Sequence, residues 1–113
     1  MQDRPTELLF VWINCKDRQE AEMLAETLIA ERLAASANTL PAIASLFHWR
    51  GAVVSAEEVP LIVKTNGLSF EALQRRVSDL HSYETPCILG LSADRVNAAY
   101  AAWLQREIPA PKI

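Results

Sequence analysis

The sequence predicts an α+β fold of the ferredoxin-like, split β-α-β type, with the element order βαββαβα. Three observations predict it: a strand–helix pattern at the start of the chain, a helix–strand–helix pattern at its end, and a long hairpin between them. Because β-α-β crossovers are right-handed, few topologies remain. We expect an antiparallel sheet in the order 4-1-3-2 with the helices on one face.

The first unit is a strand followed by a helix. Residues 7–13 are almost continuously apolar, which is typical of a strand buried on both faces. Asp17, with Glu20 three residues later, resembles a capping box and predicts a helix start. The helix should end near Leu33. Its apolar face repeats with helical spacing at Ala21, Leu24, Ala25 and Leu28.

A long hairpin follows. Its arms are residues 36–50 and 52–66, joined by a turn at 50–51. Pro41 and Pro60 lack the N–H that a strand ladder needs, so we expect each at a bulge or an outward edge.

The second unit contains a helix, a strand and a final helix. Ser69 is the expected N-cap of a helix, a strand then runs to about Leu91, and Ser92 or Asp94 should cap the last helix. We expect the tail from residue 108 to be loose. The predicted inward residues are Phe70, Leu73, Val77 and Leu80 in the first helix, and Val96, Tyr100, Trp103 and Leu104 in the second.

Size and composition set limits on function. The 113 residues predict one domain over 1–113, with an ordered core at about 7–107. A formal charge of −3 argues against nucleic acid, and no apolar run is long enough to span a membrane. The first residues lack a secretory pattern and the two cysteines fit free thiols, so we expect a cytoplasmic protein.

The fold predicts a metal site at one edge of the sheet. The end of strand one should lie beside the start of the last strand and the end of the second helix. This brings together Cys15, Cys87, His81 and Glu84, which offer ligands for a divalent cation such as copper or zinc. The alternatives are that His81 caps a helix and that the cysteines are small, half-buried residues without a partner.

A ligand cleft is the second predicted site. Its candidate residues are Tyr83, Lys64, Glu58 and Trp49. Lys64 is a lone cation in an apolar run, so it either forms a structural ion pair or captures an anion in the cleft.

The hairpin also predicts self-association. Strand one spans roughly 23 Å at about 3.3 Å per residue, whereas the arms are nearly twice as long. An unpaired apolar overhang invites another chain, so we expect a closed homo-oligomer. Alternatively, bulges at Pro41 and Pro60 shorten the arms and the protein stays monomeric.

Nearly the whole chain, from about residue 7 to 107, resembles the CutA divalent-cation-tolerance family. The resemblance implies a trimer of ferredoxin-like subunits with clefts between neighbours, and a role in metal tolerance with copper as the usual ion. The segments that carry it are 21–35, Asn38, Pro41, 45–51 (SLFHWRG), 57–59 (EEV), 61–65 (LIVKT), 80–86 (LHSYETP) and 100–104 (YAAWL).

This chain departs from the family pattern at four positions. Ser36 stands where the family usually has cysteine, and Ser82 replaces a proline. Ile13 and Leu80 stand where some members have a thiol and a second histidine. Fewer soft ligands should weaken copper binding in particular.

Taken together, these observations predict a homotrimer that binds a metal ion or small ligand in inter-subunit clefts. The alternatives are a regulatory trimer that senses a small anionic metabolite, or a small acid/base enzyme that uses His81 or Glu84. We expect no enzyme, because the sequence contains no nucleophile elbow, phosphate-binding glycine loop or HExxH motif.

Overall fold

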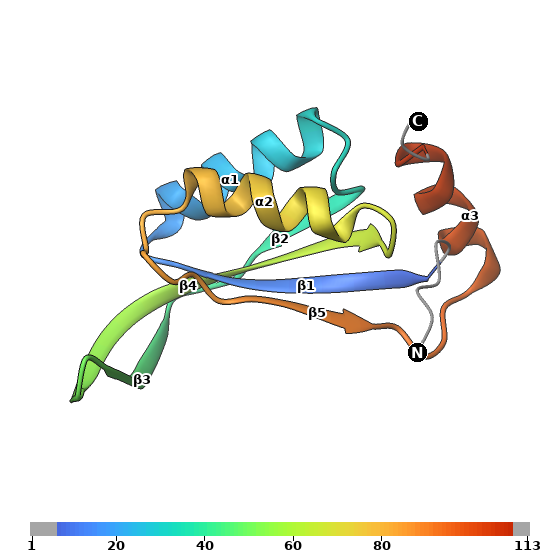
Figure 1. The fold of residues 1–113 in the computed structure, drawn as a ribbon. Helices are drawn as coiled ribbons and strands as arrows, with labels where there is room; N and C mark the ends of the chain where they lie inside the picture. Colours follow the sequence, from blue (N-terminus) through green and yellow to red (C-terminus); the bar gives the residue numbers. More distant parts are fainter. Residues whose placement is uncertain (1–6, 110–113) are drawn as a thin grey trace.

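The computed structural model describes residues 7–109 of the chain. Within this part the chain folds into a five-stranded sheet and three helices (Figure 1). No helix in this part is long and apolar enough to cross a membrane. In chain order the elements are β1 (Leu8–Cys15), α1 (Arg18–Ala30), β2 (Ser36–Thr39), β3 (Ile43–Trp49), β4 (Ala52–Asn66), α2 (Phe70–Leu80), β5 (Ile88–Ser92) and α3 (Ala98–Glu107).

The sheet confirms the predicted α+β, ferredoxin-like topology. Its order is β2-β4-β1-β5, all neighbours are antiparallel, and β3 also pairs with β4. This is the predicted order 4-1-3-2, with the second predicted strand divided into β2 and β3. Helices α1 and α2 cover one face of the sheet (Figure 1).

The division between β2 and β3 coincides with Pro41. Thr39 lies opposite Leu61, and Ile43 lies opposite Glu58. Three residues of one strand therefore face two residues of the other, which is the count of a β-bulge. The expectation of a bulge or an outward edge is met by a bulge at Pro41. Pro60 lies opposite Asn14 in β4, between β1 and β2, so it is not at an outward edge and is instead one of the two β4 residues that face this bulge.

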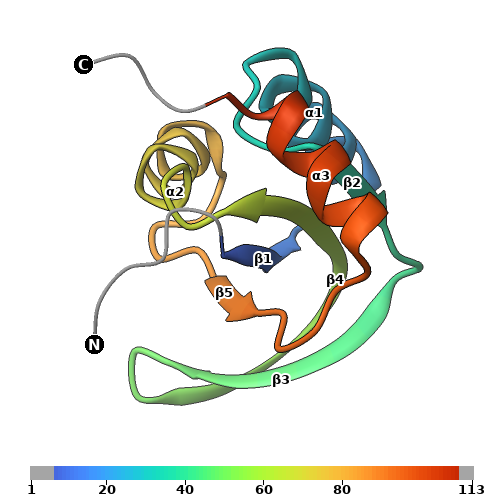
Figure 2. The same cartoon turned by 90° about the vertical axis from the view of Figure 1, so that its right-hand side faces the viewer.

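Strand β4 extends well beyond the strand that it pairs with in the body of the sheet. β1 pairs with residues 59–66 of β4, whereas residues 52–58 pair with β3. The resulting arm curves beneath the face of the sheet that the helices leave open (Figure 2). Its tight turn needs positive φ angles, 51° at Arg50 and 81° at Gly51, as in the two-residue turns that favour glycine.

Helix α1 begins as predicted but ends earlier. Oδ1 of Asp17 accepts a hydrogen bond of 2.8 Å from the Glu20 N–H, which is the first half of a capping box. The Glu20 carboxylate reaches back to the N–H of Lys16, one residue before the cap. The helix ends at Ala30 rather than near Leu33, because Arg32 adopts a φ of 60°, outside the helical range.

The end of the chain corrects three expectations. Helix α3 begins at Ala98 after Asn97, so neither Ser92 nor Asp94 caps it, and Ser92 instead closes β5. Val96 precedes the helix and is 40% exposed, so it does not point inward. Ile108 is buried against Leu8 and Leu104 and is not part of a loose tail, whereas residues 110–113 lie outside the described part.

The main core lies between the sheet and helices α1 and α2. Alternate residues of β1 and β4 face these helices, as the period of a strand requires. Those from the strands are Val11, Ile13, Cys15, Val59, Leu61 and Val63, and the helices contribute Ala21, Leu24, Leu28, Leu73 and Val77.

Candidate functional site

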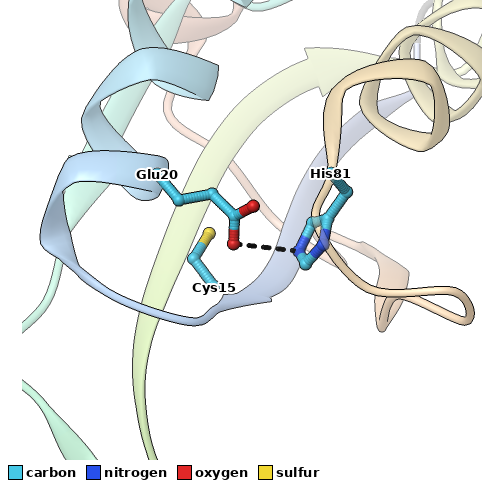
Figure 3. A group of neighbouring side chains, drawn as sticks. All are labelled: Cys15, Glu20 and His81. Carbon is cyan, nitrogen blue, oxygen red and sulfur yellow. Dashed lines mark ion pairs between the residues drawn. The ribbon is translucent and has the colours of Figure 1, made fainter.

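Three ligand-type side chains meet at the end of β1 (Figure 3). They are Cys15 at the last position of β1, Glu20 in the first turn of α1, and His81 directly after α2. One ligand atom from each lies within 4.8 Å of the others, and all three residues are buried. Among the described residues this is the one such group of three or more. The predicted edge therefore brings Cys15 and His81 together and adds Glu20, which we had interpreted as a capping residue alone.

Glu20 is held by backbone donors on both of its oxygens. Oε1 accepts a hydrogen bond of 2.9 Å from the Lys16 N–H, and Oε2 accepts one of 2.8 Å from the Ser82 N–H. Burial raises the pKa of the carboxyl group, but the hydrogen bonds from Lys16 and Ser82 outweigh it and hold the pKa below its ordinary value. The group is therefore a carboxylate at neutral pH.

His81 uses both of its ring nitrogens. Nε2 lies 2.8 Å from the carbonyl oxygen of Asn14, which can only accept, and Nδ1 accepts a bond of 3.1 Å from the Tyr83 N–H. This fixes the neutral ring with its proton on Nε2. The same nitrogen lies 3.9 Å from Oε1 of Glu20. The His81 side chain thus joins the end of β1 to the loop after α2, and only its backbone N–H caps α2.

Cys15 is a buried, protonated thiol. Burial, followed by the negative charges of Glu20, Asp17 and Glu58, raises its pKa to about 12. Its sulfur lies 3.9 Å from the carbonyl oxygen of Ile13. A metal ion would have to displace the thiol proton before it could bind this sulfur.

Cys87 and Glu84 lie outside this group. Ile88 pairs with Ile13, and continuing that register places Cys87 opposite Asn14 rather than Cys15. Because alternate residues of a strand point to opposite faces, Cys15 faces the core while Cys87 lines a cleft on the other face. Glu84 is exposed and forms an ion pair of 2.9 Å with Arg50. Their role as metal ligands stays a prediction.

A cleft of about 810 Å³ opens between the arm and the body of the molecule. Three of the four predicted cleft residues line it: Glu58, Tyr83 and Trp49. The Tyr83 hydroxyl donates a bond of 2.9 Å to Oε2 of Glu58, which joins the loop after α2 to the arm. Lys64 does not line the cleft, and its Nζ instead lies 2.5 Å from Oδ1 of Asn38 on β2.

Several known proteins are similar to this chain. A curated relative, the divalent-cation tolerance protein CutA of Thermus thermophilus, is 38% identical over 95 residues, which cover 84% of this chain and 92% of the relative. The solved CutA of Archaeoglobus fulgidus is 32% identical with a TM-score of 0.87, and the match covers 90% of this chain and 99% of the relative.

The expected cytoplasmic location is contradicted by these relatives. The Archaeoglobus protein is described as periplasmic. A chloroplastic CutA of Arabidopsis thaliana is 32% identical over 97 residues, covering 86% of this chain and 53% of the relative. Two free thiols and the pattern of the first residues therefore do not fix the compartment.

The family comparison agrees with the fold and with the residue patterns. The model of the CutA1 divalent ion tolerance proteins matches residues 9–107, which span every strand and helix described above apart from the first residue of β1. This chain belongs to the CutA1 divalent ion tolerance protein family.

Proposed function

We propose that this chain contributes to divalent-cation tolerance by binding a soft cation, copper or zinc, at Cys15, Glu20 and His81 within a homotrimer. One observation carries the proposal: sulfur, oxygen and nitrogen atoms from three separate elements converge within 4.8 Å. Thiolate, imidazole and carboxylate together suit zinc, and the first two favour copper.

Binding requires a local rearrangement. The thiol of Cys15 must release its proton. The Nε2 of His81, which faces Glu20, must release the proton that it donates to Asn14. The neutral ring then carries its proton on Nδ1, which can no longer accept the bond from the Tyr83 N–H, so both hydrogen bonds of the ring are lost. These costs predict weaker binding than at a preformed site.

The homotrimer is supported by the arm. Residues 52–58 of β4 extend past β1 and pair with β3 alone among the described strands. Leu46 and Val53 on this arm are 74% and 63% exposed, and Leu89 on β5 is 57% exposed. Exposed apolar side chains along an overhanging hairpin favour burial against copies of the same chain.

The first test is a titration with Zn²⁺ and Cu⁺ under reducing conditions, on the unaltered protein, Cys15→Ala and Cys87→Ala. Both variants remove one thiol, but only the first removes a member of the converging group. The proposal expects one ion per chain, with affinity at least tenfold lower in Cys15→Ala and unchanged in Cys87→Ala. Equal affinity in Cys15→Ala, or no binding by the unaltered protein, contradicts it.

We propose a binding role rather than a catalytic one. The acid/base enzyme that we considered would use His81 or Glu84. His81 is buried with both nitrogens hydrogen-bonded, and Glu84 is paired with Arg50. The cleft favours a second candidate function, the binding of a small ligand, because its buried carboxylate has an oxygen without a donor among the described residues.

A further inference from the structure

The cleft contains a buried carboxylate that is only half satisfied. Glu58 is 5% exposed, and its Oε2 accepts the hydrogen bond from Tyr83. Within residues 7–109, Oε1 accepts no hydrogen bond and no basic side chain lies within 4.0 Å of either oxygen. Since no fully buried side-chain oxygen in this part lacks a partner, Oε1 must reach the open space of the cleft that Glu58 lines.

A buried charge of this kind calls for a cationic partner. A buried carboxylate without a counter-charge has lost much of its hydration, so a cation that reaches it gains a favourable interaction. Tyr83 adds one neutral hydrogen bond and stays protonated, because burial, the bond to Glu58 and the charges of Glu58 and Glu20 all raise its pKa. The interior of the cleft is therefore negative and able to accept further hydrogen bonds.

The walls of the cleft select an organic cation over a bare ion. Phe47, Trp49, Val54 and Ala56 come from the same face of the arm and line the space beside Glu58. A hydrated divalent ion prefers several oxygen ligands and gains nothing from this apolar wall, although Ser45 and Thr85 also line the cleft. Aromatic faces instead attract organic cations and cover their hydrocarbon parts. An anionic ligand would meet Glu58 and be repelled.

We propose that this cleft binds a small molecule that carries a primary ammonium group, with the ammonium on Glu58 and the apolar body against Phe47 and Trp49. An ammonium has three N–H donors, enough to bond Oε1 of Glu58 and further acceptors at the cleft. The volume of about 810 Å³ lies within the range of small-molecule sites. The proposal rests on the second candidate function above, the binding of a small ligand in the cleft, and names the chemical class of that ligand.

The test uses 2-phenylethylammonium, with 2-phenylethanol as a neutral analogue of similar shape and 3-phenylpropionate as an anion. Each probe is titrated by calorimetry into the purified assembly with EDTA present, so that no metal ion contributes. The inference expects saturable binding of the ammonium, at least tenfold weaker binding of the alcohol, and none of the anion. Equal binding of ammonium and alcohol, or no binding of the ammonium, would overturn it without needing any variant.

Two variants then locate the site. Glu58→Gln keeps the shape and an acceptor for Tyr83 but removes the charge, and we expect at least a tenfold loss of ammonium affinity. Glu57→Gln removes one charge from the adjacent, exposed position of β4 and should leave the affinity unchanged. Equal effects of the two changes would overturn the inference, since they would show a general effect of charge. Dissociation of the Glu58→Gln assembly, together with loss of ammonium binding, would also overturn the inference, because it would show that Glu58 pairs with a neighbouring chain.

The outcome is separable from that of the metal proposal. Failure of the ammonium probe, with zinc still bound by the unaltered protein, removes this inference and leaves the cation site intact. Binding of the probe by Cys15→Ala as tightly as by the unaltered protein supports the inference, because Cys15 lies in the core on the other face of the sheet.

Discussion

Oε2 of Glu20 accepts a hydrogen bond of 2.8 Å from the backbone N–H of Ser82, which lies 62 residues later in the chain. Its other oxygen binds the N–H of Lys16. One carboxylate thus joins the entry of α1 to the loop that leaves α2. The same loop carries His81 and Tyr83, so this bond positions residues of both the metal group and the cleft.

Replacing this carboxylate should destabilise the fold. Glu20→Gln leaves one acceptor oxygen where two backbone N–H groups need one each, so a buried donor loses its partner. We expect the free energy of unfolding to fall by about 1–3 kcal/mol. The matched control is Glu22→Gln, which alters an exposed i,i+4 ion pair with Arg18 and should change stability by less than about 0.5 kcal/mol. Urea unfolding of both variants measures the difference, and equal values would contradict a structural role for Glu20.

The same residue predicts a pH dependence. Its pKa in the folded protein is held below the ordinary 4.5, so the unfolded chain takes up its proton first as the pH falls. The stabilisation is therefore fully present above about pH 4.5 and is lost as the pH falls through the folded pKa. Urea unfolding between pH 6 and pH 3 should show a shallower loss of stability in Glu20→Gln than in the unaltered protein. Parallel curves would show that Glu20 does not contribute to the acid sensitivity.

Gly90 on β5 leaves little room for a side chain. It pairs with Val11, and a Cβ at this position would lie 2.9 Å from Cε1 of Phe70, the first residue of α2. We expect Gly90→Ala to cost about 1–3 kcal/mol through overpacking. In a Phe70→Leu background the ring is absent, so the same change should cost at least about 0.5 kcal/mol less. Thermal or urea unfolding of the four proteins completes this cycle, and a cost that is the same in both backgrounds would contradict the packing explanation.

Local patterns predicted most of the fold. The strand at residues 7–13, the capping pair Asp17 and Glu20, and the turn at 50–51 all depend on residues close together in the sequence, and each is present. The start of α3 was misplaced because Ser92 and Asp94 have the right chemistry for a cap, but Ser92 pairs with Leu9 in β5. Participation in the sheet outweighed the local capping preference.

The candidate site was only partly predictable for the same reason. Topology placed Cys15 and His81 at one edge, but the contribution of Glu20 depends on its contact with Ser82, which local spacing does not encode. The position of Cys87 depends on the register between β1 and β5, which the sequence does not specify. A shift of one residue would have turned Cys87 toward Cys15, whereas the observed pairing places the two thiols on opposite faces. One sequence signal did point to Glu20. In a capping box such as Asp17–Glu20, the side chain of the third helical residue turns back toward the preceding strand.

Native mass spectrometry of the purified protein tests the central proposal most directly, because it gives the number of subunits and of bound ions together. We predict a trimer that gains three zinc or copper ions, a trimer without ions for Cys15→Ala, and three ions retained by Cys87→Ala. A monomer, or an assembly whose mass does not change when either metal is added, would contradict the proposal.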